Sequence, residues 1–166
     1  MHVQAPSGRQ YGGVEASFLG HIHVPTDTPP VHYPGSPCGL NITESGPRRF
    51  LVLDTDTLTL TPHTVNSDIV FMRERCLALP EEGEDARLQQ EITARLAAWD
   101  LNDTMRSRVQ VRIEASGFCE DREAIRDVLV EGFSEYTLEG GQPRLTGLEV
   151  NPDLQLMSLA SRVRAC

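Results

Sequence analysis

Hydrophobic and polar residues alternate in short stretches over the first 65 residues, and longer helical repeats begin only after residue 66. Alternation with a period of two is typical of strands that bury one face. The Asp-Thr-Asp sequence at 54–56 predicts a hairpin turn, and residues 26–30 predict a loop. The predicted strands of this part cover residues 14–23, 31–33, 50–54 and 57–61.

The remainder of the chain alternates strands with helices. Val109, Val111 and Ile113 face one way in the clearest strand, and hydrophobic residues recur at steps of three and four in two further segments. The predicted strands cover residues 68–79, 108–115 and 145–150, and the predicted helices cover residues 85–99 and 120–133. Such a set packs two helices on one face of a small sheet.

The two patterns together predict an α+β chain with two domains, residues 1–65 and residues 66–166. The first domain has no helix to cover the second face of its strands, so it cannot easily close a core alone. The second domain has both layers. No stretch approaches eighteen consecutive apolar residues, and the N-terminus lacks the apolar core of a secretion signal, so we expect a chain without a membrane segment.

The four cysteines, Cys38, Cys76, Cys119 and Cys166, are far apart and include no Cys-x-x-Cys pair. A zinc knuckle is therefore disfavoured, and free thiols in a reducing cytoplasm are favoured over two disulfides. The net charge of −9 gives no overall attraction to nucleic acid, so any contact with DNA would have to be local. All 15 basic residues are arginines, which can bind phosphate bidentately.

Two histidines one residue apart, His21 and His23, are the first candidate for chemistry. In an extended segment their side chains point to the same face, and Gly20 before them leaves room for backbone or ligand. The Pro-Gly-Ser-Pro sequence at 34–37 predicts a tight loop beside them. Neutral imidazoles suit manganese, iron and zinc, whereas a surface pair or a structural pair is the alternative interpretation.

The segments Leu-Gly-His-Ile-His at 19–23 and Tyr-Pro-Gly-Ser-Pro at 33–37 resemble the last metal-binding motif of the calcineurin-like metallophosphoesterases. Within that family they are most similar to the SbcD-type DNA repair nuclease subunits, where a glutamate and a pair of strands follow the loop. Glu44 and the stretch 49–54 occupy the same order here. The resemblance covers residues 11–62, and beyond them only the order of elements resembles the capping domain of the family.

The resemblance implies a fold and a cofactor. Residues 1–65 would be the β-strand remnant of a metallophosphoesterase core, and residues 66–166 would be a small capping domain with two helices and three strands. His21, His23 and His2 would be ligands of a two-metal site, usually Mn²⁺. The residues of the pocket loop would be Gly20, Gly35 and Ser36.

Most catalytic motifs of the family do not occur in this chain. The Asp-x-His, Gly-Asp and Gly-Asn-His motifs of the family precede its histidine pair, and none of them is found here. The resemblance therefore assigns no catalytic residue. It implies the C-terminal part of a two-metal DNA exonuclease or endonuclease subunit, which hydrolyses phosphodiester bonds in double-strand break repair and is inactive as this chain alone.

By the same resemblance, the partners are DNA and an SbcC-type ATPase subunit, and the parent protein is a cytoplasmic homodimer. Two other functions stay open: a non-catalytic capping module that contacts DNA or a partner, and a phosphoesterase for a small phosphate ester. Arg48 and Arg49 are interpreted as a solvated surface pair. His32 and His63 are interpreted as residues that flank strands.

Overall fold

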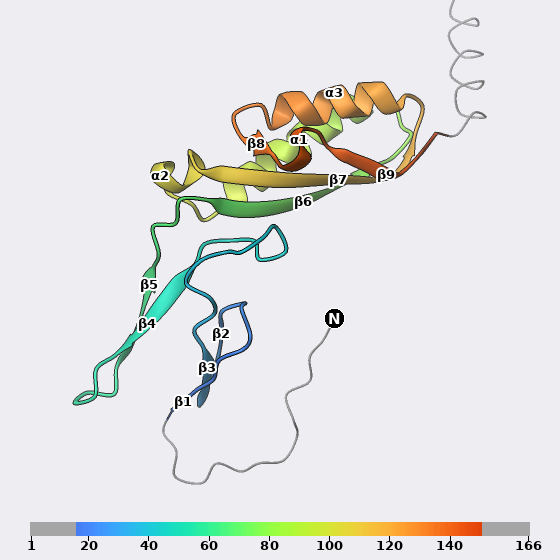
Figure 1. Cartoon of the computed structure of the whole chain (residues 1–166). Coiled ribbons are helices and arrows are strands. Elements are labelled where there is room, and N and C mark those ends of the chain that lie inside the picture. The colour runs from blue at the N-terminus through green and yellow to red at the C-terminus, as the bar shows by residue number, and fades with distance from the viewer. Residues whose placement is uncertain (1–15, 151–166) are drawn as a thin grey trace, which may run out of the picture. The chain divides into compact units, whose positions relative to one another are not determined.

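The computed structural model describes residues 16–150, which form two compact units (Figure 1). Of these residues, 16–38 and 48–65 belong to the first unit, and 39–47 and 66–150 belong to the second. The chain is α+β, as the sequence predicts. None of the helices among the described residues is long and apolar enough to cross a membrane.

The first unit begins with a small sheet of three short strands, β1 (Ser17–Phe18), β2 (Thr26–Thr28) and β3 (Val31–Tyr33). The middle strand β3 pairs in parallel with β1 and antiparallel with β2. The predicted strand at 14–23 is therefore wrong after Phe18, because the backbone of His21 turns into the left-handed region at φ +74°. The predicted loop at 26–30 is also wrong at its start, where β2 forms.

The first unit continues with a hairpin of β4 (Arg49–Leu53) and β5 (Leu60–Thr64). The prediction for β4 is confirmed to within a residue, whereas β5 begins three residues later than the predicted strand at 57–61. The later start of β5 results from the turn that follows β4. The Asp54 carboxylate accepts the backbone N–H groups of Asp56 and Thr57 at 2.9 Å each, and Leu58 then adopts φ +54°.

The second unit contains a four-stranded sheet in which every strand pair is parallel. The central strand β7 (Val109–Cys119) has β6 (Val70–Ala78) on one side. On its other side lie β8 (Thr137–Leu138) and β9 (Arg144–Val150), one after the other along the strand. The helices are α1 (Glu84–Ala98), α2 (Asp103–Arg106) and α3 (Arg122–Gly132), with a 3₁₀ turn η1 (Glu139–Gly141).

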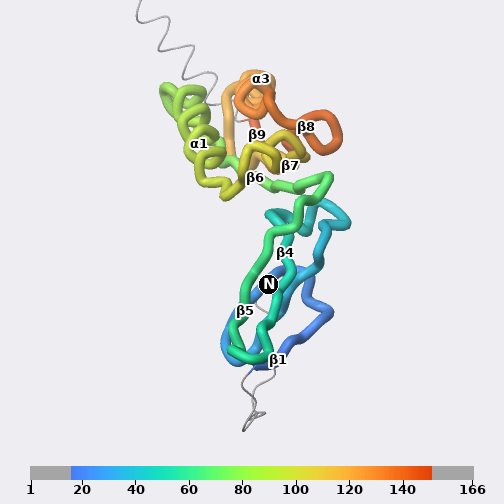
Figure 2. The backbone as a smooth tube through the Cα atoms, turned by 90° about the vertical axis from the view of Figure 1, so that its left-hand side faces the viewer, coloured from blue at the N-terminus to red at the C-terminus, as the bar shows by residue number. Residues whose placement is uncertain are grey.

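The two long helices lie on the same face of this sheet (Figure 1, Figure 2). The strands β6, β7 and β9 follow one another across the sheet in chain order. Right-handed crossovers in one direction must place α1 and α3 on one side, so neither of these two helices lies on the other face of the sheet. The predicted order of strand, helix, strand, helix, strand is confirmed, and the two-residue β8 and four-residue α2 are additions to it.

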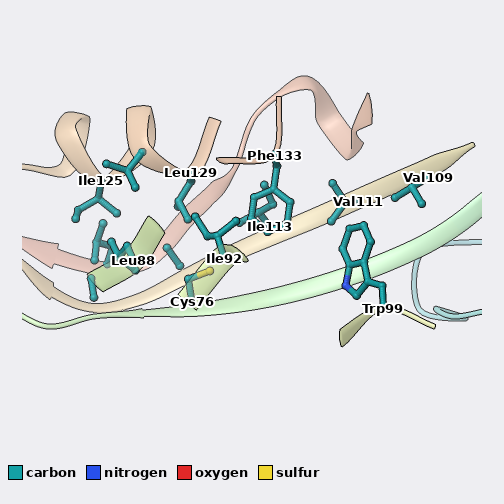
Figure 3. Packing of buried hydrophobic residues seen from close by; sticks show 14 of the residues in the cluster. Cys76, Leu88, Ile92, Trp99, Val109, Val111, Ile113, Ile125, Leu129 and Phe133 are labelled. Carbon is teal, nitrogen blue, oxygen red and sulfur yellow. The ribbon is translucent and has the colours of Figure 1, made fainter. Parts of the chain in front are cut away.

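The buried core of the described residues lies between these helices and the sheet (Figure 3). Val109, Val111, Ile113 and Ala115 alternate inward along β7, and Leu88 and Ile92 of α1 meet them. The first unit differs, because none of its described hydrophobic residues is buried. The α+β core of the chain is thus a property of the second unit.

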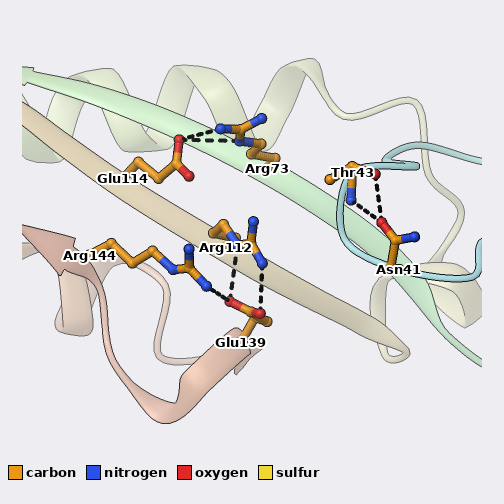
Figure 4. Close-up of polar contacts among 7 residues, drawn as sticks. All are labelled: Asn41, Thr43, Arg73, Arg112, Glu114, Glu139 and Arg144. Carbon is orange, nitrogen blue, oxygen red and sulfur yellow. Dashed lines mark hydrogen bonds and ion pairs between the residues drawn. The ribbon is translucent and has the colours of Figure 1, made fainter.

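The loop 39–47 is held within the second unit by its own short hydrogen bonds (Figure 4). The Asn41 side chain accepts the Thr43 backbone N–H at 2.9 Å and its hydroxyl at 2.6 Å. The Gly46 N–H donates to the Phe71 carbonyl of β6 at 2.8 Å. The Asn41 bonds order the loop itself, and the Gly46 bond joins it to β6 of the second unit.

Candidate functional site

The two candidate histidines lie on an exposed loop that follows β1. The chain leaves the strand after Phe18, and both His21 and His23 are exposed. Because His21 has a positive φ, the segment is not an extended strand, and alternation along a strand does not place both imidazoles on one face. Their proximity has to come from the loop and from the segments that contact it.

A hollow of about 330 Å³ gathers the predicted site residues of the first unit. One wall is the loop 18–23, which includes Gly20, His21 and His23, and the other is formed by 34–36, which includes Gly35 and Ser36. The remaining predicted ligand, His2, lies outside the described residues. The structure therefore brings the histidine pair and the Pro-Gly-Ser loop to one place, although not through an extended strand.

Gly35 lies close to the other wall of this hollow. Its φ is +84°, and a Cβ atom added there would lie 2.9 Å from both the His23 carbonyl oxygen and Pro25 Cγ. The neighbouring Ser36 N–H donates to the same His23 carbonyl at 3.1 Å. Only glycine combines this backbone conformation with this proximity.

Arg48 is a site residue that the sequence interpretation placed wrongly. It is only 3% exposed, and its Nη1 donates to the His23 carbonyl oxygen at 3.0 Å. It is therefore not a solvated surface residue. It fixes the backbone that carries His23, together with the Ser36 N–H. No local sequence pattern indicates this contact, because Arg48 and His23 are 25 residues apart. The neighbouring residue, Arg49, begins β4.

A second polar cluster joins β2, β3 and β4. His32 Nδ1 lies 3.1 Å from Asp27 Oδ1, and Arg49 Nη2 lies 2.7 Å from Asp27 Oδ2. Partial burial acts to raise the pKa of Asp27, but the Arg49 and His32 side chains outweigh it and hold that pKa below its ordinary value. The Phe18 ring stacks on His32 with centroids 5.6 Å apart. Sequence reasoning missed this cluster because its members are separated along the chain.

The described residues do not form a metal centre by themselves. Within 16–150, no group of three or more His, Cys, Asp and Glu side chains is placed to hold a metal ion. His21 and His23 are two exposed imidazoles, and a transition-metal site needs more donors than two. The loop therefore presents two exposed imidazoles beside a fixed glycine loop.

Comparison with known proteins adds no relative. No protein-family model matches the chain, and no curated protein is significantly similar to it. The resemblance to metallophosphoesterases therefore depends on the residues of the histidine loop and of the Pro-Gly-Ser loop.

Proposed function

We propose that this chain supplies the last metal-binding loop and the capping domain of an SbcD-type nuclease subunit, which hydrolyses phosphodiester bonds in DNA. One observation carries the proposal: His21, His23 and Gly35 line the same hollow. In the proposal, the two imidazoles bind Mn²⁺ together with donors outside the described residues, and DNA and an SbcC-type ATPase are the partners.

The exposed apolar side chains of the first unit support the same proposal. Phe18, Phe50, Val52 and Leu58 are all more than two-fifths exposed, and no described hydrophobic residue of this unit is buried. A layer of strands normally buries one face against another layer. In the proposal, these apolar side chains are exposed because the remainder of the phosphoesterase core, which would cover them, is not part of the described unit.

The first test is a nuclease assay with the 166-residue chain, Mn²⁺ and linear DNA. We expect no cleavage above that of a mock preparation, because two imidazoles cannot hold a metal pair. A His21→Ala variant purified in parallel is the matched control. Robust cleavage by the chain that is lost in His21→Ala would contradict the proposal of an incomplete centre.

The second test reads the DNA upstream of the Met1 codon in the same frame. The nuclease proposal expects Asp-x-His, Gly-Asp and Gly-Asn-His motifs within a domain's length, about 150 residues. If these motifs are absent, no upstream residues can supply the remaining metal ligands, and the nuclease proposal is excluded. The non-catalytic capping module described next would then be the remaining candidate.

A non-catalytic capping module is the second candidate, and the location of the core favours it. All residues of the buried cluster lie between Val70 and Leu148, so the second unit closes its own core. Such a unit can act as a binding module without any metal. The two candidates differ in one measurable way, since only the nuclease needs the imidazoles of His21 and His23.

A further inference from the structure

The sheet face opposite α1 and α3 presents an arrangement of arginines and glutamates (Figure 4). Side chains alternate along each strand, so the residues between the buried ones point to this open face. On β6 they include Arg73 and Arg75, and on β7 they include Arg112 and Glu114. Arg144 of β9 pairs in register with Glu114. Arginines from three strands therefore share one surface.

Each of two carboxylates on this face is shared by two arginines. Glu114 Oε2 lies 2.7 Å from Arg73 Nη2 and 3.4 Å from Arg75 Nε. In the same way, Glu139 lies 2.8 Å from Arg112 Nη2 and 3.2 Å from Arg144 Nη2. Four guanidinium groups face two carboxylates in these clusters, so the two clusters together are net positive in a chain of net charge −9.

A groove of about 460 Å³ opens on this face where β7 and β9 lose their regular register. Glu114 pairs with Arg144, but Ser116 already pairs with Gly147, so β9 has an extra residue there. A bulge of this kind interrupts the ladder and turns side chains and backbone groups toward the surface. The residues that line the groove with polar side chains are Arg75, Glu114, Ser116, Arg144 and Thr146.

The two arginines of the groove keep donors that the carboxylates do not use. The Nε of Arg75 lies 3.4 Å from Glu114 Oε2, and the Arg75 side chain is 70% exposed. Arg144 contacts Glu139 through Nη2, and its side chain is about half exposed. A guanidinium has five N–H donors, so both arginines can bind a further anion. Ser116 and Thr146 add hydroxyl donors at the same groove.

We propose that this groove binds a phosphate group, held by Arg75 and Arg144 and hydrogen-bonded by Ser116 and Thr146. Arginine suits phosphate because its planar N–H groups match two phosphate oxygens. The phosphate belongs either to a small phosphate compound or to the backbone of a nucleic-acid strand. The inference does not rest on the histidine loop, because none of its residues belongs to that loop, whereas a nucleic-acid strand as the source would fall within the DNA binding of the proposed capping domain.

The Glu114 carboxylate provides a specific test of the proposal, because it would compete with a bound phosphate for the guanidinium donors. It lies in the groove and occupies donors of Arg73 and Arg75. A bound phosphate would have to share these arginines with it. Removing the charge of Glu114 should therefore strengthen phosphate binding, whereas removing that of Arg75 or Arg144 should weaken it. A variant that merely damaged the fold would weaken binding in every case.

The experiment titrates the full chain, labelled with ¹⁵N, with inorganic phosphate up to about 10 mM and separately with a short single-stranded oligonucleotide. We expect amide shifts at 114–116 and 144–147. Arg75→Gln and Arg144→Gln should each raise the dissociation constant about tenfold or more, as expected for a lost charge-assisted hydrogen bond. Glu114→Gln should lower it about tenfold.

Arg126→Gln is the matched control, because Arg126 is a partly exposed arginine of α3 and the substitution changes the net charge equally. It should leave both titrations unchanged. Tighter binding of longer oligonucleotides identifies a nucleic-acid strand as the source, and equal affinity for free phosphate identifies a small compound. The inference is overturned if neither probe binds, if Arg126→Gln weakens binding as much as Arg75→Gln, or if Glu114→Gln weakens it.

Discussion

Gly35 connects the two walls of the candidate site, so its substitution tests the geometry of the histidine loop. We expect Gly35→Ala to change the ring-proton shifts of His21 and His23, because the new Cβ would crowd the His23 carbonyl at a φ of +84°. Positive φ at a residue with a side chain costs about 1–3 kcal/mol. The measurement is a pair of NMR spectra of the histidine rings.

Gly46→Ala is the control for that substitution. Gly46 has a similar φ of +94°, but an added Cβ would meet no atom within 4 Å. It therefore shares the backbone strain without the crowding. If Gly35→Ala shifts the ring signals no more than Gly46→Ala does, the two walls are not in contact as described.

The cysteines give a second prediction at the residue scale. Burial, followed by the nearby Glu91 charge, raises the pKa of the Cys76 thiol to about 11, and burial also raises the pKa of Cys119. Cys38 is exposed. At pH ~8, iodoacetamide should therefore alkylate Cys38 in the folded chain and reach Cys76 and Cys119 only after denaturation, since the thiolate is the reactive form.

Mass spectrometry of the digested chain locates the label on each of these cysteines. A denatured sample of the same chain shows how fast each thiol reacts when exposed. Equal alkylation of Cys38 and Cys76 in the folded chain would show that the second unit does not enclose Cys76.

Local motifs made part of the site predictable from the sequence. His21, His23, Gly35 and Ser36 stand in short segments whose residue types have direct physical meaning, and the structure places all of them at one hollow. Arg48 could not be found in this way. Its role depends on a hydrogen bond to His23, 25 residues away, and no local pattern encodes such a contact.

At the scale of elements, Glu74 joins β6 to α1 and to the residue that follows it. Its carboxylate accepts Trp99 Nε1 at 2.7 Å and Arg95 Nη1 at 3.1 Å, and the residue is only 8% exposed. We expect Trp99→Phe to lower the free energy of unfolding by about 1–3 kcal/mol, because it removes a donor from a buried carboxylate. Urea unfolding followed by circular dichroism measures the change.

The double variant with Glu74→Leu separates this hydrogen bond from the packing of the indole ring, because leucine has no acceptor for Trp99 Nε1. If the bond matters, Trp99→Phe should cost less free energy in the Glu74→Leu background than in the native chain. An equal cost in both backgrounds would mean that the indole stabilises the unit by packing alone.

The carboxylate–arginine pairs on the open sheet face should make the stability of the fold depend on pH. Hydrogen bonding to Arg73 lowers the pKa of Glu114, and hydrogen bonding to Arg112 lowers the pKa of Glu139. A carboxylate with a lowered folded pKa stabilises the fold above its ordinary pKa, and this stabilisation is lost as pH falls through the folded value. The melting temperature should therefore fall as pH drops below about 4.5.

The combined variant Glu114→Gln and Glu139→Gln should show a shallower fall over the same pH range. Melting temperatures of the two proteins are compared at matched salt concentrations, because these pairs are partly exposed and salt screens them. Parallel curves would mean that these carboxylates do not interact with the arginines in solution.

Element prediction succeeded where a long periodic pattern existed. The helices α1 and α3 and the strands β6 and β9 match predicted segments to within two residues, whereas β7 begins one residue later and ends four residues later than the predicted strand at 108–115. The late start of β5 reflects an Asp54 side-chain turn that composition alone did not specify. The two-residue β8 and the four-residue α2 are too short to produce a period.

At the scale of the whole molecule, the contrast between the two units predicts their local stability. The described core lies in the second unit, and the described hydrophobic residues of the first are not buried. Hydrogen exchange of the full chain should therefore be slow in β6, β7, α1 and α3. It should be fast in β1, β2, β3 and the β4–β5 hairpin, because local opening there exposes little apolar surface.

Leu88→Ala tests whether the two units are energetically separate. Leu88 is fully buried in the core of the second unit, so its truncation should destabilise that unit by about 2–5 kcal/mol. Exchange in the second unit should accelerate, whereas exchange in the β4–β5 hairpin should stay the same. Equal acceleration in both would show that the units unfold together.

The most direct test of the account is paramagnetic broadening of the histidine rings by Mn²⁺. Small amounts of Mn²⁺ are added to the full chain, and the ring signals of His21, His23, His32 and His63 are followed by NMR. The His21 and His23 signals should disappear first, because even weak Mn²⁺ binding at the proposed donor pair broadens the rings nearest to the ion. Broadening of His32 or His63 at the same or a lower Mn²⁺ concentration would contradict the assignment of the histidine loop as a metal-binding element.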